Sequence, residues 1–176
     1  CALQINVPTG KDSLSMTQKY PNGEKVISPG TVIVSAGAEV SDVRNVTSPV
    51  VVNDEDSTLL HIDFSKSELQ LGGSAFFQTL GAVGSKAPQV EDAEYFRAAF
   101  NAVQTIEKNG FALAGHDVSA GGLVTCLLEM CFSNTKGGLN VSLDAFAEKD
   151  LLKILFAENP AVVLQVANAN LDAVKK

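Results

Sequence analysis

The chain has 176 residues, of which 45% are hydrophobic and 19% are charged, a composition typical of one ordinary soluble domain with an appended segment. Its formal net charge of -7 would repel a phosphate backbone, and no stripe of Lys and Arg offsets that charge, so nucleic acid is excluded as an expected partner. There is no run of about 18 apolar residues, and the start lacks the pattern of a secretory signal. We therefore expect no membrane association and a cytoplasmic location.

Two strands and a turn are predicted near the start of the chain. Residues 2–7 are short, partly alternating and ended by a proline, which predicts a strand that runs into the polar loop 9–13. Residues 21–23, Pro-Asn-Gly, are typical of a turn, and residues 28–30, Ser-Pro-Gly, predict a break that we interpret as a domain boundary. Over 31–40 the apolar side chains alternate strictly, which is the period of a long half-buried strand.

The clearest predicted element is a helix over 91–108, where apolar residues recur at helical spacing and Asn109-Gly110 provides a stop. Strands and helices alternate along this part of the chain, which predicts an α+β fold, layered as in α/β proteins, with a mixed sheet packed by helices. The other predicted elements are strands over 59–64, 111–114, 139–143 and 161–166, a short helix opened by Gly72-Gly73-Ser74 and reaching residue 80, and helices over 119–132 and 149–157.

The two ends of the chain indicate a piece of a longer protein. No initiator methionine precedes Cys1, and residues 170–176 are typical of the opening of a helix that the chain does not complete. We expect one domain boundary, between 1–28 and 29–176, with the second domain truncated at its C-terminal end.

The cysteines are predicted to be structural. Cys126 and Cys131 are five residues apart in one predicted buried helix, a spacing that suits neither a disulfide nor a metal site. We interpret both as small apolar core residues. The two histidines, His61 and His116, are not in metal-ligand spacing either, so neither zinc nor a catalytic histidine is expected.

The segment 116–122, His-Asp-Val-Ser-Ala-Gly-Gly, is the sharpest local signal for a binding site. It is predicted to be a loop in which Ser119 caps the following helix, while Gly121 and Gly122 let the unpaired N–H groups of the helix start approach an anion. Asp117 would repel a bare phosphate, but a magnesium ion between carboxylate and phosphate would bridge them. The alternative is an ordinary capped helix start whose glycines serve packing.

Gly10-Lys11-Asp12-Ser13 is a second candidate. It lacks the first glycine of a P-loop and has Asp between Lys and Ser, so it is not a Walker motif. After a strand, Lys11, Asp12 and Ser13 suit a phosphate and a metal ion, although an exposed turn explains them equally well. The Gly72-Gly73-Ser74 helix start is a weaker signal of the same kind.

Four motifs in order carry a resemblance to a known family. They are VPTGKDSLSM at 7–16, VSAGAEVSDVR at 34–44, LGGS at 71–74 and HDVSAGGL at 116–123. In order and spacing the chain resembles the second synthetase half of the large, single-chain phosphoribosylformylglycinamidine synthases, members of the aminoimidazole ribonucleotide synthetase superfamily. The resemblance implies the superfamily's C-terminal-type fold, partly ferredoxin-like, for 29–176, and the end of an N-terminal-type domain and its linker for 1–28.

The resemblance also implies a reaction and partners. In this family ATP activates the formamide oxygen of formylglycinamide ribonucleotide, and ammonia from glutamine displaces the phosphate, which gives formylglycinamidine ribonucleotide in purine biosynthesis. The second half holds a structural ADP with Mg²⁺, so the cofactors implied are ATP or ADP and Mg²⁺. The partners implied are the other domains of the same polypeptide, including a glutaminase domain beyond the end of this chain that carries the nucleophile, and the isolated piece is expected to be inactive.

By resemblance, Asp117 is expected to be a magnesium ligand and Ser119 a nucleotide contact. Lys11, Asp12 and Ser13 match a family motif whose contacts we do not assign; we keep Lys11 and Ser13 as nucleotide candidates and Asp12 as a metal candidate. Gly121 and Gly122 enter from the helix-start argument alone. Glu158-Asn159-Pro160 departs from the glutamate-rich turn expected at that place, so no role follows for Glu158.

Two other readings stay open. One is a non-catalytic scaffold domain whose nucleotide only cements domain packing. The other is a different ATP-using enzyme of the superfamily, such as selenophosphate synthetase, thiamine monophosphate kinase or the hydrogenase maturation dehydratase. The GKDSLSM stretch at 10–16 favours the amidotransferase.

Overall fold

The computed structural model describes residues 2–10, 15–28, 32–40 and 42–175. The chain divides into two compact units, Cys1–Val43 and Arg44–Lys176. No helix within the described residues is both long and apolar enough to cross a membrane. The predicted boundary between 28 and 29 adjoins residues 29–31, which lie outside the described residues, and it stays a prediction.

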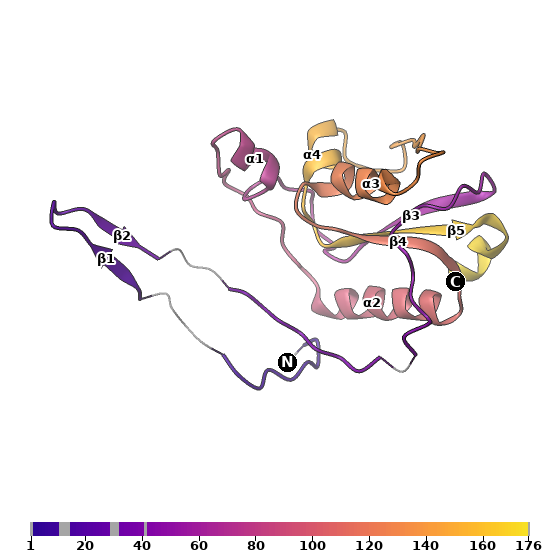
Figure 1. The fold of residues 1–176 in the computed structure, drawn as a ribbon, viewed down its shortest axis with the longest axis horizontal. Coiled ribbons are helices and arrows are strands. Elements are labelled where there is room, and N and C mark those ends of the chain that lie inside the picture. The colour runs from indigo at the N-terminus through magenta and orange to yellow at the C-terminus, as the bar shows by residue number, and fades with distance from the viewer. Residues whose placement is uncertain (1, 11–14, 29–31, 41, 176) are drawn as a thin grey trace. The chain divides into compact units, whose positions relative to one another are not determined.

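The first unit contains a small antiparallel hairpin (Figure 1). Its strands are β1, Thr17–Lys19, and β2, Lys25–Ile27. The Tyr20 N–H donates to the Glu24 carbonyl oxygen at 2.9 Å, and Gly23 adopts a positive φ of 88° that favours glycine. The turn predicted from Pro-Asn-Gly is therefore confirmed.

The two longer strands predicted in this unit are wrong. Residues 2–7 and 32–40 have no strand assignment, and both segments are almost entirely exposed. Val32 and Val34 expose 88% and 83% of their surface. A strand is completed by hydrogen bonds to a neighbouring strand, and neither segment pairs with another among the described residues. The alternating pattern is present in the sequence, but the described part of the chain does not supply the neighbouring strand that would complete it.

The second unit is built on a three-stranded sheet in the order β3-β5-β4. The strands are β3, Ser57–Asp63, β5, Ala161–Ala167, and β4, Ala112–Val118. Both pairings are antiparallel, so the sheet is antiparallel in the described part of the chain and not mixed as predicted. The central strand β5 is a nearly continuous apolar run, as expected for a strand covered on both faces.

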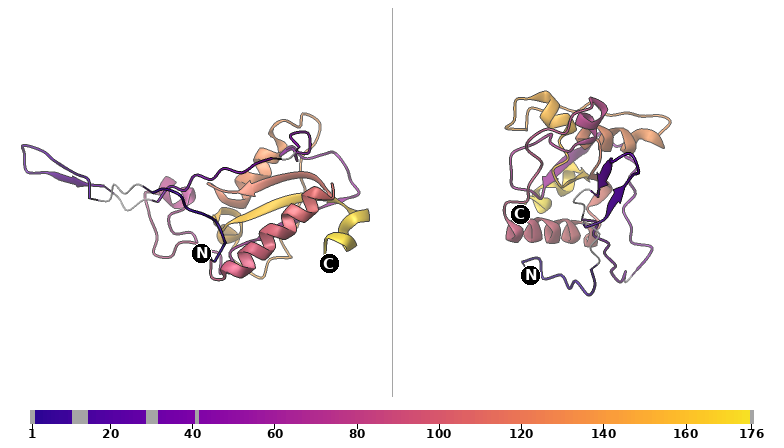
Figure 2. Two further views of the ribbon diagram at one scale, coloured as in Figure 1. Left: turned by 90° about the horizontal axis from the view of Figure 1, so that it is seen from below. Right: turned by 90° about the vertical axis from the view of Figure 1, so that its left-hand side faces the viewer.

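Helices cover both faces of this sheet, which confirms the predicted α+β class (Figures 1 and 2). One face carries α2, and the other carries α3 and α4. Each face has its own core cluster: Phe64, Val103, Ile106, Leu164 and Val166 under α2, and Val51, Ala114, Val118, Leu123, Cys126, Met130, Ile154, Ala161 and Val163 under α3 and α4. The helices are α1, Ala75–Thr79, α2, Ala93–Lys108, α3, Gly122–Phe132, α4, Leu151–Phe156, the 3-10 turn η1, Asn168–Asn170, and α5, Leu171–Val174.

Side-chain caps explain where three of the helices begin. The Asp92 carboxylate accepts from the Glu94 and Tyr95 N–H groups at the start of α2. Asp150 caps α4 in the same way, and the Ser74 hydroxyl accepts from the Phe77 N–H at the start of α1. The helices predicted over 91–108 and 149–157, and from residue 74 to 80, are therefore confirmed within a few residues.

The strands predicted over 59–64 and 161–166 are also confirmed, but two other predictions in the second unit need correction. The strand predicted over 111–114 continues to Val118, because β4 pairs with β5 as far as Ala161. Residues 139–143 are not a strand. Leu139 and Leu143 pack against the core cluster under α3, so their apolar pattern reflects burial without strand pairing.

The core under α3 makes a testable prediction for Met130, which is 0% exposed. Met130→Ala should lower the free energy of unfolding by about 2–5 kcal/mol, because it leaves a cavity in a packed interior. Leu128→Ala, on the same helix but 54% exposed, is the control and should cost about 0.5 kcal/mol or less. Urea denaturation measures both; equal losses would contradict the described packing of α3.

A second prediction concerns Cys126 and Cys131, which are both unpaired and on α3. Burial, with smaller contributions from the carboxylates of Asp117 and Glu129, raises the pKa of the Cys126 thiol from 9.0 to about 12. The folded state therefore keeps a proton that the unfolded state loses above about pH 9, so this thiol lowers stability as the pH rises through that range. Alkylation of the native protein at pH 8 should label the partly exposed Cys131 well before Cys126; the reverse order would be the contrary result.

Candidate functional site

The candidate site is the end of β4 together with the turn that joins β4 to α3, residues 117–122, which we call the acidic turn. Asp117 is the next-to-last residue of β4, and Ser119 follows the strand directly. Both residues are exposed, while Val118 between them is buried in the core. Because side chains alternate along an extended chain, Asp117 and Ser119 both face away from the core cluster that receives Val118. The structure thus places the two residues predicted by resemblance together at one exposed edge of the sheet.

The Asp117 carboxylate is open to solvent, with 69% of the side chain exposed. Its Oδ1 lies 3.4 Å from Nδ1 of His116, whose Nδ1–H donates to the Asp117 carbonyl oxygen at 2.8 Å. Nε2 of the same ring lies 3.3 Å from the Glu129 carboxylate on α3. His116 therefore ties the end of β4 to α3 and leaves the Asp117 carboxylate accessible from outside.

An open hollow lies beside Asp117, on the side of the sheet that carries α2. Its lining includes Glu107 and Gln104 of α2 and Thr47 of the segment that precedes β3. The Thr47 hydroxyl donates to the Glu107 carboxylate. Among the described residues, no donor on another element bonds to the Asp117 carboxylate, the second carboxylate at this hollow.

Asp117 could hold a metal ion only together with ligands that other side chains of its surroundings do not supply among the described residues. Within the described residues, no three His, Cys, Asp or Glu side chains are grouped to hold a metal ion. Mg²⁺ is commonly held by one or two carboxylates together with the phosphates of its nucleotide and several waters. A single exposed carboxylate at the sheet edge suits a nucleotide-bound magnesium ion and does not suit an all-protein cage.

The predicted cap of α3 is wrong, and two of the N–H groups at this helix start are not free. The N-cap of α3 is Gly121 and not Ser119, so the N-cap residue has no side chain that could accept from the first turn. The Gly121 N–H already donates to the Glu158 carboxylate at 2.8 Å, and the Gly122 N–H donates to the Ser119 carbonyl oxygen at 3.0 Å. The argument that placed Gly121 and Gly122 at a nucleotide therefore loses its premise, since both donors are used within the chain.

The two glycines are needed instead for their backbone conformation and because they lack a side chain. Gly121 and Gly122 have positive φ values of 91° and 74°, which L side chains rarely adopt. A Cβ on Gly122 would lie 2.7 Å from the Leu155 carbonyl oxygen and from the Phe156 Cα, where α4 ends. For Gly122, the alternative prediction that the glycines serve packing is therefore confirmed, because this glycine lets the start of α3 lie directly against the backbone of α4. A Cβ on Gly121 would instead meet the Thr125 side chain of α3 itself.

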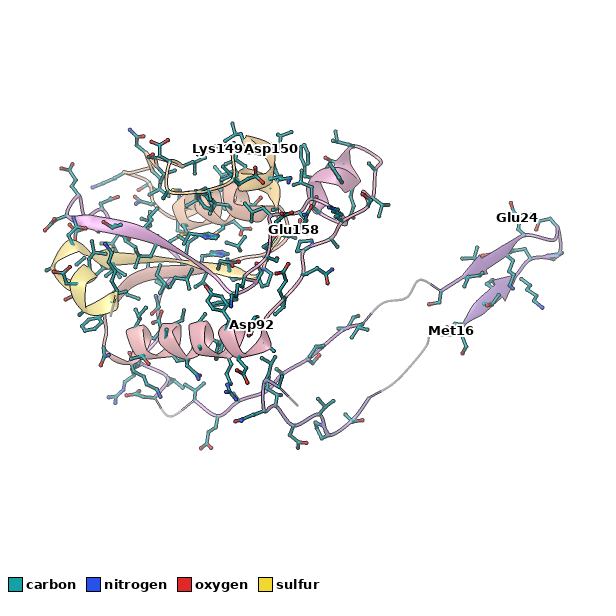
Figure 3. The ribbon with its side chains drawn as sticks, turned by 180° about the vertical axis from the view of Figure 1, so that it is seen from behind. Met16, Glu24, Asp92, Lys149, Asp150 and Glu158 are labelled. Atoms are coloured by element: carbon teal, nitrogen blue, oxygen red, sulfur yellow. The ribbon has the colours of Figure 1, made fainter. Side chains whose placement is uncertain are left out.

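Glu158 is the residue that the sequence reasoning missed (Figure 3). Its Oε1 accepts hydrogen bonds from the Gly121 N–H and from the Ala75 N–H, each at 2.8 Å. The next residue, Asn159, is 2% exposed and its amide donates to the Ser65 and Ser67 hydroxyls. The signal available in the sequence was an acidic residue between a predicted helix and a predicted buried strand. A carboxylate is stabilising where it lies close to a helix N-terminus, as Glu158 does at the starts of α3 and α1.

The other candidates of the sequence analysis lie elsewhere or outside the described residues. Lys11, Asp12 and Ser13 are not among the described residues, so their roles stay predictions. Gly72-Gly73-Ser74 does open a helix, where the buried Ser74 is the cap. Burial lowers the pKa of His61, an effect that Asp63 opposes, and the ring packs against Phe146 with 5.1 Å between centroids.

The fold and the turn define a class of protein: an α+β domain with an antiparallel sheet, covered on both faces, and an acidic strand-to-helix turn that carries two glycines. The chain belongs to the family described as AIR synthase related protein, C-terminal domain, whose model matches residues 55–176. It is also 38% identical over 174 residues to the "Probable phosphoribosylformylglycinamidine synthase, chloroplastic/mitochondrial" of Arabidopsis thaliana. That match covers 98% of this chain and 12% of the Arabidopsis protein, and it confirms the predicted resemblance.

The packing role of Gly122 can be tested with a matched pair of substitutions. Gly110 also has a positive φ, 66°, but has open space where a Cβ would be added. Gly110→Ala should therefore show only the conformational cost, roughly 1–2 kcal/mol. Gly122→Ala adds a clash with the α4 backbone and should cost roughly 2–5 kcal/mol in the free energy of unfolding. Equal costs in urea denaturation would contradict the close approach of α3 and α4.

Proposed function

We propose that this chain is part of a glutamine-dependent carbon–nitrogen ligase of purine biosynthesis. The reaction would convert formylglycinamide ribonucleotide, glutamine and ATP to formylglycinamidine ribonucleotide, ADP, phosphate and glutamate. The observation that carries this proposal is the 98% coverage of the chain by a relative whose name states that synthase activity. No residue of this chain is proposed as the nucleophile, and the chain would act together with the other domains of its polypeptide, among them a glutaminase domain.

Within that enzyme, this piece would contribute to an auxiliary Mg-ADP site. The support is the exposed Asp117 carboxylate at the end of β4, with Ser119 directly after the strand. Asp117 would hold the magnesium ion and Ser119 would contact the nucleotide, while Lys11, Asp12 and Ser13 are further candidates for phosphate and metal. Bound magnesium would supply positive charge that offsets repulsion between the Asp117 carboxylate and the phosphates.

A non-catalytic scaffold domain is the second candidate, and one observation favours it. The N–H groups of Gly121 and Gly122 are bonded within the chain, which is what a purely structural helix start requires. A scaffold whose nucleotide only cements domain packing would also retain ADP, so nucleotide content does not separate the two candidates. The synthase reaction of the intact polypeptide separates them, because only a part of the ligase would be needed for that reaction.

The proposed location is the cytoplasm. The Arabidopsis relative carries the words chloroplastic/mitochondrial in its name, which describe that protein and not this chain. The difference does not affect the proposed site, since Asp117 and Ser119 act within the folded enzyme.

The proposal predicts a specific defect in Asp117→Asn. In the intact polypeptide, this change removes the charge that binds Mg²⁺ while it keeps the size of the side chain, so half-retention of ADP should need about tenfold more Mg²⁺. Asp172→Asn, which removes an exposed carboxylate on α5, is the control and should leave retention unchanged. Bound ADP is measured by chromatography of the denatured, purified protein over a Mg²⁺ series. Equal retention in Asp117→Asn and wild type would contradict the site.

A further inference from the structure

Glu158 lies between α4 and β5 and bonds to two further segments of the second unit. It follows the last turn of α4, precedes the buried strand β5, and is half-buried. A single atom of its carboxylate, Oε1, receives the N–H groups of Gly121 and Ala75. These are hydrogen bonds to a charged acceptor, which are stronger than those between neutral groups.

The two donors belong to separate parts of the second unit. Gly121 ends the turn that carries Asp117 and Ser119, whereas Ala75 begins α1. The segment 71–87 around α1, which we call the α1 lobe, is closed on itself by the bonds from the Gly72 and Gly73 N–H groups to the Lys86 and Val83 carbonyl oxygens, each at 2.7 Å. Because both donors reach one oxygen atom, Glu158 holds the acidic turn and the α1 lobe side by side.

The backbone that carries Glu158 is itself held in place. The Asn159 amide donates to the Ser65 and Ser67 hydroxyls at 3.1 Å, and the Pro160 carbonyl oxygen accepts from the Phe64 N–H at 2.8 Å. On the other side of Glu158, the Phe156 ring stacks on Phe76 of α1 with 4.5 Å between centroids. The carboxylate therefore has a defined position relative to the sheet and can impose that position on the turn.

We propose that Glu158 is a positioning residue for the Mg-ADP site: through the Gly121 N–H it sets the position of the Asp117–Gly122 turn and couples that turn to the α1 lobe. This inference rests on the proposed function of Asp117 and Ser119. Ser119 is two residues from Gly121 and its carbonyl oxygen accepts from the Gly122 N–H, so a shift of the bonded turn moves Ser119 as well. Binding groups lose effect when they are displaced by about 1 Å, which is why a residue without ligand contact can control the site.

The test compares three variants of the intact polypeptide. Glu158→Ala leaves both N–H groups without their acceptor. Glu158→Gln keeps a carbonyl oxygen, and since both bonds go to one atom, that oxygen can accept both. Glu148→Ala is the matched control, because the Glu148 Oε1 also accepts two backbone N–H groups, those of Lys149 and Asp150, next to the start of α4.

Two measurements are made on each variant: ADP retained over a Mg²⁺ series, and hydrogen exchange of the peptides that contain Gly121 and Ala75. Glu158→Ala should need about tenfold more Mg²⁺ for half-retention and should exchange faster in both peptides, while Glu158→Gln stays within about threefold of wild type. Glu148→Ala should retain ADP as wild type does, although it loses the same number of hydrogen bonds to backbone donors.

The outcomes separate this inference from the proposed function. A wild-type protein that retains no ADP would overturn the Mg-ADP site, and the positioning role with it. Retention in wild type that is unchanged in Glu158→Ala, or lost equally in Glu158→Ala and Glu148→Ala, would overturn the positioning role alone. If Glu158→Gln lost as much ADP retention as Glu158→Ala, an acceptor oxygen at this position would not be enough. That result would overturn the role of Oε1 as hydrogen-bond acceptor.

Discussion

The burial of β5 between two antiparallel neighbours is the constraint on which the rest of the second unit depends. Val163, Leu164 and Val166 are almost fully buried. Val163 belongs to the core cluster under α3 and α4, and Leu164 and Val166 belong to the cluster under α2. The pairing of β5 with β4 places Asp117 opposite Val162 and so fixes where the acidic turn leaves the sheet. The start of β5 lies three residues after Glu158, so the same strand also fixes the acceptor of the Gly121 N–H.

At the acidic turn, acceptor groups of the same chain bond the N–H groups at the start of α3. A helix N-terminus carries partial positive charge and unpaired N–H groups, which makes it attractive to anions. In this chain the Glu158 carboxylate is that anion at Gly121, and the Gly122 N–H is bonded to the turn itself. The helix start therefore offers these two N–H groups to no further anion, and the exposed groups at this turn are the side chains of Asp117 and Ser119.

Helices and strands were not equally predictable from the sequence. The helix over Ala93–Lys108 has its cap, its apolar face and its stop within one local segment, so its bounds could be predicted closely. The alternating residues 32–40 and the apolar residues 139–143 satisfy the periodicity of strands without forming them. Strand formation depends on a partner elsewhere in the chain, and periodicity within one segment carries no information about whether that partner is present.

The sequence alone determined the α+β class, the helices of the second unit and the identity of Asp117 and Ser119 as candidates, because these rest on local caps, periodicity and a conspicuous motif. Only the tertiary structure decided that His116 and Asp117 belong to a strand, that Gly122 serves a close contact with α4, and that the N–H groups of Gly121 and Gly122 are already bonded. It also brought Glu158 to Gly121, 37 positions apart in the sequence, and to Ala75, 83 positions apart. Such contacts are set by how the sheet stacks its helices, which no local pattern encodes.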